Sequence, residues 1–252
     1  MNARSALAAL VLMLLALPAP ARAALPDEIQ VYTNDLEKPG ERGVELHINT
    51  TPKGRTEPEY PGEVVPHHGL RVTPEISWGL APNWDWGVYL PFVRSNDGAL
   101  FFAGPRFRLK WLPLRPAEGG TGAFAGVNVE ISFVQERFEQ AQRTAEIRPI
   151  LGYRGEAWLL AFNPNLETDL AGENKGVFTF SPAFKAARRA WGETALGIEY
   201  YAELGRLSHF APRDEQSHIV YLTLDTERVN FGIGYGLTGA SDRWTVKTII
   251  SF

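Results

Sequence analysis

The chain has 252 residues, no cysteine and a formal net charge of -4 at pH 7. The lack of cysteine excludes disulfides, thiolate metal sites and cysteine nucleophiles, and the mildly acidic balance gives no electrostatic footprint for nucleic acid. The mean hydropathy of -0.17 is that of an ordinary soluble protein. Strands that alternate between lipid and lumen average to the same value, so a membrane β-barrel stays possible.

The first 23 residues have the features of a secretory signal peptide. Arg4 supplies a positive start, residues 6–17 form a run of Leu and Ala, and Pro18 begins the break after it. The sequence Ala-Arg-Ala at 21–23 then offers small residues at the two positions that a signal peptidase reads. The run is too short to cross a bilayer comfortably as a helix. We therefore expect export and cleavage near Ala23.

Residues 24–41 precede the first strand and are rich in acidic side chains. We expect an N-terminal extension in the periplasm, although the same segment could instead fold into the lumen of a barrel. The rest of the chain, residues 42–252, consists of about twelve short runs with period-two alternation, each near the 9–11 residues that a tilted membrane strand needs. Clusters of Gly, Pro, Asn and Asp separate these runs, as turns do.

Within each run, one parity is apolar and the other is polar or glycine. The apolar members of the clearest runs are, in chain order, Val44, Leu46 and Ile48; Trp84, Trp86, Val88, Leu90 and Phe92; Phe101, Ala103, Phe107, Leu109 and Trp111; Val127, Val129, Ile131 and Phe133; Leu196, Ile198, Tyr200, Ala202 and Leu204; Val229, Phe231, Ile233, Tyr235 and Leu237; and Trp244, Val246, Thr248, Ile250 and Phe252. This parity is almost free of charge, as a lipid-facing surface requires.

The tryptophans distinguish a membrane barrel from a soluble sandwich, which would also alternate. Six of the seven are predicted to lie near one rim, beside short turns. They are Trp78, Trp84, Trp86, Trp111, Trp158 and Trp191. Tryptophan favours the membrane interface, so these residues form a predicted girdle. We predict an all-β fold: a single antiparallel up-and-down transmembrane β-barrel of about 12 strands.

A family resemblance supports this fold. The run VTPEISWGL at residues 72–80 and the run WGVYLPF at residues 86–92 resemble the second and third strands of proteobacterial outer-membrane proteins grouped as "MetA-pathway of phenol degradation". The likeness is clearest over residues 44–113. It implies a barrel with a transport role, and the family offers no catalytic residues to carry over.

The polar parity defines the predicted lumen. Its candidate lining and selectivity residues are Arg71, Glu75, Arg106, Arg108, Lys110, Glu130, Glu146, Arg148, Glu199, Glu203, Arg243 and Lys247. Charges of both signs could line an aqueous path and select small polar or anionic solutes. They could also pair with one another and hold the lumen shut. We therefore expect either a non-enzymatic channel or uptake protein, or a structural barrel with an occluded, salt-bridged lumen.

A lipid hydrolase of the outer membrane is the enzymatic alternative. Its nearest candidates are Ser208 and His209 with Asp214 or Glu215, and no nucleophile-elbow motif accompanies them. His67 and His68, which have glutamates nearby, are the metal candidates in the first long loop, where solvated side chains are the simpler interpretation. We predict no catalytic residues, metal or cofactor.

Phe252 ends the chain on the apolar parity of the last strand. A terminal aromatic in this place resembles the signal that the barrel-assembly machinery of the outer membrane reads. The expected partners are that machinery, outer-membrane lipid and lipopolysaccharide, and an unidentified small solute, and no nucleic acid is expected. The expected location is the cell outer membrane.

Overall fold

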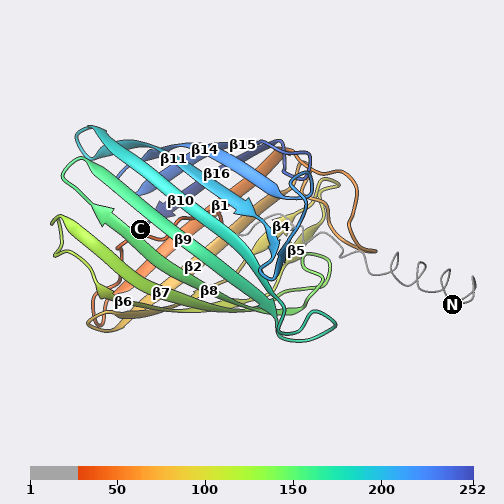
Figure 1. The fold of residues 1–252 in the computed structure, drawn as a ribbon, viewed down its shortest axis with the longest axis horizontal. Coiled ribbons are helices and arrows are strands. Elements are labelled where there is room, and N and C mark those ends of the chain that lie inside the picture. The colour runs from red at the N-terminus through yellow and green to blue at the C-terminus, as the bar shows by residue number, and fades with distance from the viewer. Residues whose placement is uncertain (1–27) are drawn as a thin grey trace, which may run out of the picture.

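The alternating runs fold as antiparallel strands that close on themselves (Figure 1). The structure, a computed structural model, describes residues 28–252. Its strands are β1 (Arg42–Lys53), β2 (Leu70–Ala81), β3 (Trp84–Tyr89), β4 (Phe92–Arg94), β5 (Leu100–Phe102), β6 (Arg106–Leu114), β7 (Gly122–Phe133), β8 (Arg143–Arg154), β9 (Trp158–Asp169), β10 (Phe178–Trp191), β11 (Thr194–Glu203), β12 (Gly205–Arg206), β13 (His209–Phe210), β14 (Ser217–Asp225), β15 (Val229–Gly236) and β16 (Trp244–Ser251). No helix in the described part is long and apolar enough to cross a membrane.

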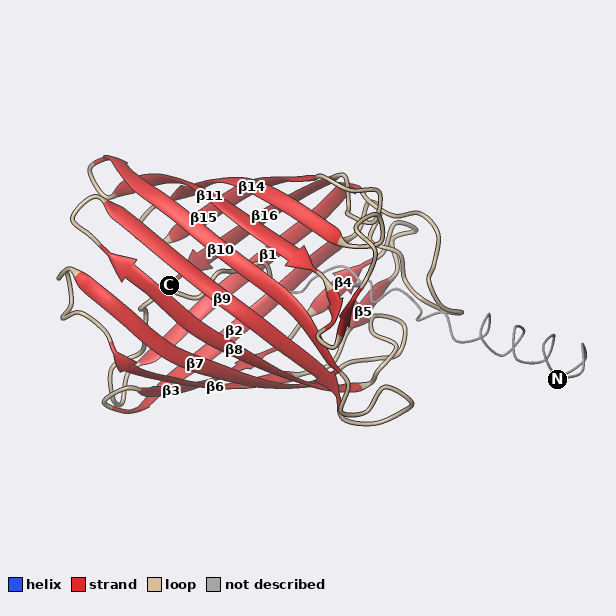
Figure 2. Cartoon of the chain, in the orientation of Figure 1, coloured by secondary structure: helices blue, strands red, loops and turns tan. Residues whose placement is uncertain are grey.

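The wall of the barrel has 12 strands, as the sequence predicts. The short pieces β3 and β4 form one broken wall strand, β5 and β6 form another, and β12 and β13 make a small hairpin beside the wall. Neighbouring strands pair in chain order, and β1 pairs with both β2 and β16, which closes the sheet (Figure 2). The short turns lie at one end of the barrel, here called the turn end, and the long connections lie at the other, the loop end.

Two prolines interrupt the wall, and the second break changes its parity. Pro91 separates β3 from β4 and Pro105 separates β5 from β6, because proline has no N–H to donate to the ladder. Gly104 has φ +117, and a Cβ there would lie 1.9 Å from the carbonyl oxygen of Phe133. The predicted outward placement of Phe101 and Ala103 is wrong. The break resets the alternation, so Ala103 is buried while its neighbour Phe102 is exposed.

The outer wall carries the predicted apolar surface. The six tryptophans of the predicted girdle lie near the turn end, where Trp78 stacks on Trp86 at 4.5 Å and Trp84 stacks on Trp111 at 5.5 Å between ring centroids. Trp244 begins β16 at the loop end. The outward side chains of the wall are mostly large and apolar, which suits a surface that faces hydrocarbon.

Leu222 tests this outward surface, because its side chain is 69% exposed near the middle of β14. Leu222→Arg is expected to lower the free energy of unfolding in a bilayer by about 2–4 kcal/mol, since an arginine at mid-depth loses its hydration. Guanidinium titration in lipid vesicles, followed by tryptophan fluorescence, measures the change. Leu222→Ile is the control, and equal stability of the two variants would contradict a lipid-facing β14.

Candidate functional site

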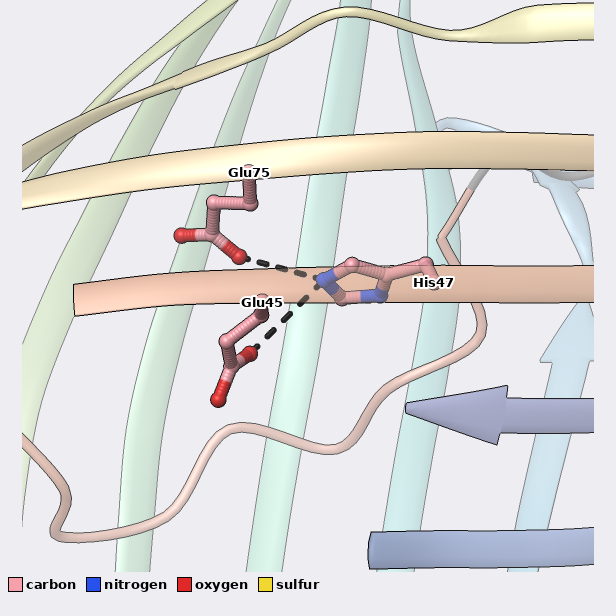
Figure 3. Close-up of side chains that lie close together, drawn as sticks. All are labelled: Glu45, His47 and Glu75. Carbon is pink, nitrogen blue, oxygen red and sulfur yellow. Dashed lines mark hydrogen bonds and ion pairs between the residues drawn. The ribbon is translucent and has the colours of Figure 1, made fainter. Parts of the chain in front are cut away.

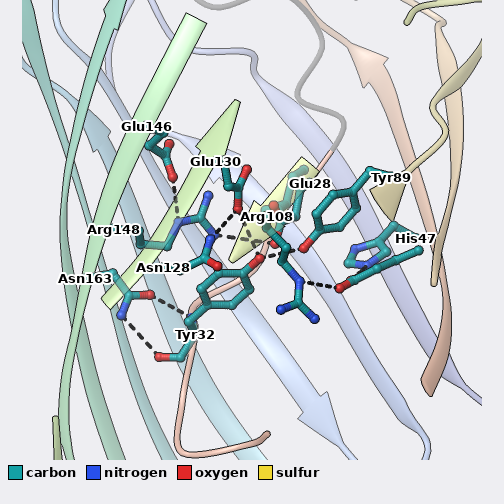
Figure 4. A network of polar contacts seen from close by, with 12 residues as sticks. Glu28, Tyr32, His47, Tyr89, Arg108, Asn128, Glu130, Glu146, Arg148 and Asn163 are labelled. Carbon is teal, nitrogen blue, oxygen red and sulfur yellow. Dashed lines mark hydrogen bonds and ion pairs between the residues drawn. The ribbon is translucent and has the colours of Figure 1, made fainter. Parts of the chain in front are cut away.

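The interior of the barrel holds a segment of the protein's own chain. Residues 28–37, here called the luminal strap, run inside the wall before the chain turns into β1 (Figure 4). Ile29, Val31 and Tyr32 are each 5% exposed or less. Of the two placements that the sequence allowed for this region, the structure has the luminal one, so a free periplasmic extension does not describe residues 28–37. Residues 1–23, the predicted signal peptide, lie outside the described residues.

Tyr32 is the central anchor of the strap. Its backbone N–H donates to Asn163 Oδ1 at 2.7 Å, and Asn163 Nδ2 donates back to its carbonyl oxygen at 3.1 Å. Its hydroxyl lies 2.5 Å from that of Tyr89 and donates to Glu130 Oε1 at 3.1 Å. The guanidinium of Arg148 lies 4.4 Å from the ring centroid. The wall therefore holds both the backbone and the ring of this residue.

Further contacts fix the two ends of the strap. At its start, Lys247 Nζ donates to the carbonyl oxygen of Ile29 at 2.9 Å. At its end, the backbone N–H of Glu37 donates to Asp85 Oδ2 at 3.2 Å. The chain then passes so close to β2 that a Cβ on Gly79 would lie 2.0 Å from the carbonyl oxygen of Lys38. Only glycine fits there without displacing the strap's exit.

One side of the lumen is apolar where the strap packs against it. Leu112, Phe124 and Ile150 point inward and are almost fully buried beneath Val31 and Tyr32. An aqueous pore would leave these side chains wet. Covering them with the strap removes that cost, which is roughly 25 cal/mol for each Å² of apolar surface.

The luminal charges form paired clusters. Lys185 Nζ lies 3.1 Å from Glu199 and 2.7 Å from Asp225, and Lys247 Nζ donates to the same Glu199 carboxylate. On the other side, Arg108 Nε lies 2.7 Å from Glu75 Oε1, and Arg108 Nη1 pairs with Asp85. Each of these buried charges thus has an opposite partner, as burial requires.

Most of the predicted lining residues lie inside the wall. The buried ones are Arg71, Glu75, Arg108, Lys110, Glu130, Arg148, Glu199 and Lys247, and the half-buried ones are Arg106, Glu146 and Glu203. Arg243 differs, because it is exposed at the loop end with its guanidinium 4.3 Å from the ring centroid of Tyr235. Strand β16 begins only at Trp244, so the parity argument does not extend to Arg243.

Sequence reasoning missed the uncharged luminal residues. Tyr32, Asn163 and Tyr201 were not among the candidates, although Tyr201 donates to Glu199 at 2.5 Å. A search of the polar parity for amides and tyrosines, and not only for charges, would have found the last two. Tyr32 lies before the first strand, where no alternation marks it.

At the loop end, connections between strands fold inward. Phe138, from the β7–β8 connection, is 1% exposed and packs with Val93, Ala103 and Val134. The guanidinium of Arg71 lies 5.6 Å from its ring centroid, which places Phe138 over a luminal side chain.

The β1–β2 loop contacts this inward-folded connection. The backbone N–H of Val64 in the β1–β2 loop donates to the carbonyl oxygen of Arg137 at 2.8 Å. The N–H of Arg55 donates to Asp242 Oδ1 at 3.0 Å and ties the same loop to the β15–β16 connection. Burial raises the pKa of the Asp242 carboxyl, and the hydrogen bond and charge of Arg55 partly offset this increase.

At the turn end the interior stays partly open. A cavity of about 540 Å³ lies between the strap and the wall, lined by side chains that include Glu37, Glu45, Glu75, Arg154, Lys185 and Arg189. The lumen is therefore a polar recess at the turn end and is filled in its middle by the strap, with inward-folded connections at the loop end.

Comparison with known proteins identifies the fold. No family model and no curated protein matches this chain. The crystal structure of an outer-membrane channel from Pseudomonas putida F1 is similar with a TM-score of 0.54 and 11% sequence identity, covering 89% of this chain and 100% of that chain. The chain has the fold of this channel. A bacterial polysaccharide outer-membrane secretin also matches, with a TM-score of 0.38 and 13% identity over 86% of this chain and 99% of that chain.

The catalytic and metal candidates of the sequence lie at the loop end. Ser208 and His209 are exposed in the β12–β13 hairpin, and among the described residues no hydrogen bond joins them. His67 and His68 stack on one another at 3.9 Å between ring centroids, and His67 Nδ1 accepts the N–H of Gly54. Ser208 and His209 therefore lack the hydrogen-bond contact that a nucleophile and its base need. Among the described residues, His67 and His68 belong to no group of three potential metal ligands that lie close together.

Proposed function

We propose that the protein is a non-enzymatic outer-membrane channel or uptake protein for small polar solutes, closed in this conformation by the luminal strap. The observation that carries the proposal is the nature of the obstruction. Barrels of eight strands are filled by their own wall side chains, whereas those of sixteen or more are open. Here a barrel of intermediate size is filled by a separate segment, residues 28–37, which pairs with no strand of the wall.

The lining indicates the solute class. Charges of both signs face the recess, including Glu45, Arg154, Lys185 and Arg189. A mixed-sign lining suits small polar or charged solutes and offers nothing for a large apolar one. A permanently closed structural barrel is the second candidate, and the buried Lys247–Glu199 pair favours it.

Export and assembly belong to the same proposal. A signal peptide at residues 1–23 would direct the chain to the periplasm, and Phe252, which is 77% exposed at the end of β16, would be read by the barrel-assembly machinery. The tryptophans at the turn end would lie at the periplasmic interface, and the loop end would face lipopolysaccharide.

A variant that loosens the strap tests the proposal. Asn163→Ala removes two hydrogen bonds to Tyr32, together worth about 2 kcal/mol, which corresponds to a roughly 30-fold higher open probability. Planar-bilayer recordings measure that probability directly.

Asn165→Ala is the matched control, because Asn165 is a buried asparagine on the same face of β9 whose side-chain oxygen has no hydrogen-bond partner among the described residues. Asn163→Ala should open far more often than Asn165→Ala or wild type. If all three stay silent at high salt, the closed structural barrel is the better description.

A further inference from the structure

Three side chains on neighbouring strands point toward one another (Figure 3). Glu45 and His47 lie on β1, and Glu75 lies on β2. His47 Nε2 is 3.1 Å from Glu75 Oε2 and 3.7 Å from Glu45 Oε2. The three atoms all lie within 4.8 Å of one another, and His47 and Glu75 are buried.

Each carboxylate is held by its other oxygen. Arg108 Nε donates to Glu75 Oε1 at 2.7 Å, and Ser251 Oγ donates to Glu45 Oε1 at 2.8 Å. The two Oε2 atoms are therefore oriented toward the imidazole by outer partners. Metal-binding carboxylates have this arrangement, with one oxygen on the ion and hydrogen bonds that fix the group from outside.

The spacing fits a tetrahedral ion. Zinc bonds to imidazole nitrogen and carboxylate oxygen are about 2.0–2.2 Å long, so tetrahedral ligands lie about 3.4 Å apart. The separations of 3.1 and 3.7 Å from His47 Nε2 fall on either side of that value. The three ligand atoms need only small shifts to surround one ion.

Charge provides an independent argument. Glu45 and Glu75 are direct cross-strand partners, a placement in which like charges repel. Arg108 lies close by but also pairs with Asp85. His47 Nε2 lies at hydrogen-bond distance from Glu75 Oε2, and Nδ1 has no hydrogen-bond partner among the described residues. Without an ion, a proton on Nε2 links the imidazole to Glu75. The ion would replace that proton, which can move to Nδ1. A cation between the two carboxylates would relieve the repulsion and accept the Nε2 lone pair.

The site has a route to solvent. Glu45 and Glu75 both line the cavity at the turn end, while His47 lies deeper in the lumen, two residues further along β1. An ion could enter from that side, and a water molecule could fill a fourth position. One nitrogen and two carboxylate oxygens suit zinc and its neighbours in the transition series better than calcium, which takes six to eight oxygens.

We propose that Glu45, His47 and Glu75 bind one divalent ion of the zinc class, with water as the fourth ligand. The ion joins β1 to β2 next to the exit of the luminal strap. This site does not depend on the proposed channel function, because binding is measured without any current.

Titration of the purified, detergent-solubilised barrel with Zn²⁺ in a calorimeter tests the site. Wild type should bind one ion, and His47→Gln and Glu75→Gln should lose it. Ser251→Ala should weaken binding by about 10- to 100-fold, because it removes an outer partner and no ligand. Co²⁺ in place of zinc should give visible absorption bands that disappear in His47→Gln.

The controls are His67→Gln and Glu146→Gln, which change a histidine and a luminal glutamate outside the cluster and should bind as wild type does. Heat-dependent gel mobility verifies that each variant is folded. Glu45 is only partly buried, so Glu45→Gln supplies a ligand variant with little risk to folding. Failure of wild type to bind Zn²⁺, or equal binding by wild type and Glu45→Gln, would overturn the proposal. The three side chains would then be only an ion-paired group that links β1 to β2.

Discussion

Deletion of residues 28–37 is expected to convert a nearly silent barrel into one that carries a steady stepwise current. The strap fills the middle of the lumen through Tyr32, and the wall strands pair with one another without it. Its removal should therefore open the path and leave the barrel folded. Single-channel recording in a planar bilayer, with heat-dependent gel mobility as the measure of folding, gives both results.

A synthetic peptide provides the matching control. The peptide of residues 28–37, added to the turn end of the deletion variant, should block the current, and a scrambled peptide of the same composition should not. Docking depends on the position of Tyr32 relative to Asn163, so composition alone cannot restore it. A deletion variant as silent as wild type would show that the folded loops, and not the strap, close the lumen.

Glu199→Leu is expected to lower the free energy of unfolding by about 3–5 kcal/mol, because it leaves two buried lysines without their shared partner. The Glu199 side chain is 1% exposed and pairs with both Lys185 and Lys247. Lys185 keeps Asp225, but Lys247 has no second carboxylate within ion-pair distance among the described residues. Guanidinium titration of the barrel in lipid vesicles measures the loss.

Glu118→Gln is the control for this prediction. Glu118 pairs with Lys38 at 2.9 Å, but the two side chains are 83% and 56% exposed. Solvent screens such a pair, so this variant should unfold at nearly the same denaturant concentration as wild type. Equal stability of the two variants would mean that water reaches the Glu199 cluster freely.

The wall of the barrel could be predicted because its information is local. In β16, the side chains of Thr245, Lys247 and Ile249 point inward, whereas those of Trp244 and Val246 do not. This alternation with a period of two can be recognised in the sequence alone. The same alternation placed Glu199 and Arg108 in the lumen. Both are buried there.

The rest could not be predicted because it depends on contacts between distant residues. Tyr32 binds Asn163, which lies 131 positions away in the sequence, and no local pattern around Tyr32 predicts that contact. The metal cluster needs the register that sets Glu45 opposite Glu75. The parity change at Ala103 follows from a backbone break at Gly104 and Pro105, and a pattern that assumes an unbroken strand cannot detect it.

The pairing of β1 with β16 also has a consequence for the order of events during assembly. Lys247 on β16 donates to the carbonyl oxygen of Ile29, 218 positions earlier, so the strand that closes the barrel against β1 also holds the strap inside it. Contacts this distant in sequence form late, because long loops must close first. We expect closure of the sheet and docking of the strap to coincide. A newly assembled barrel would then enter the membrane with its lumen already filled and would not leak.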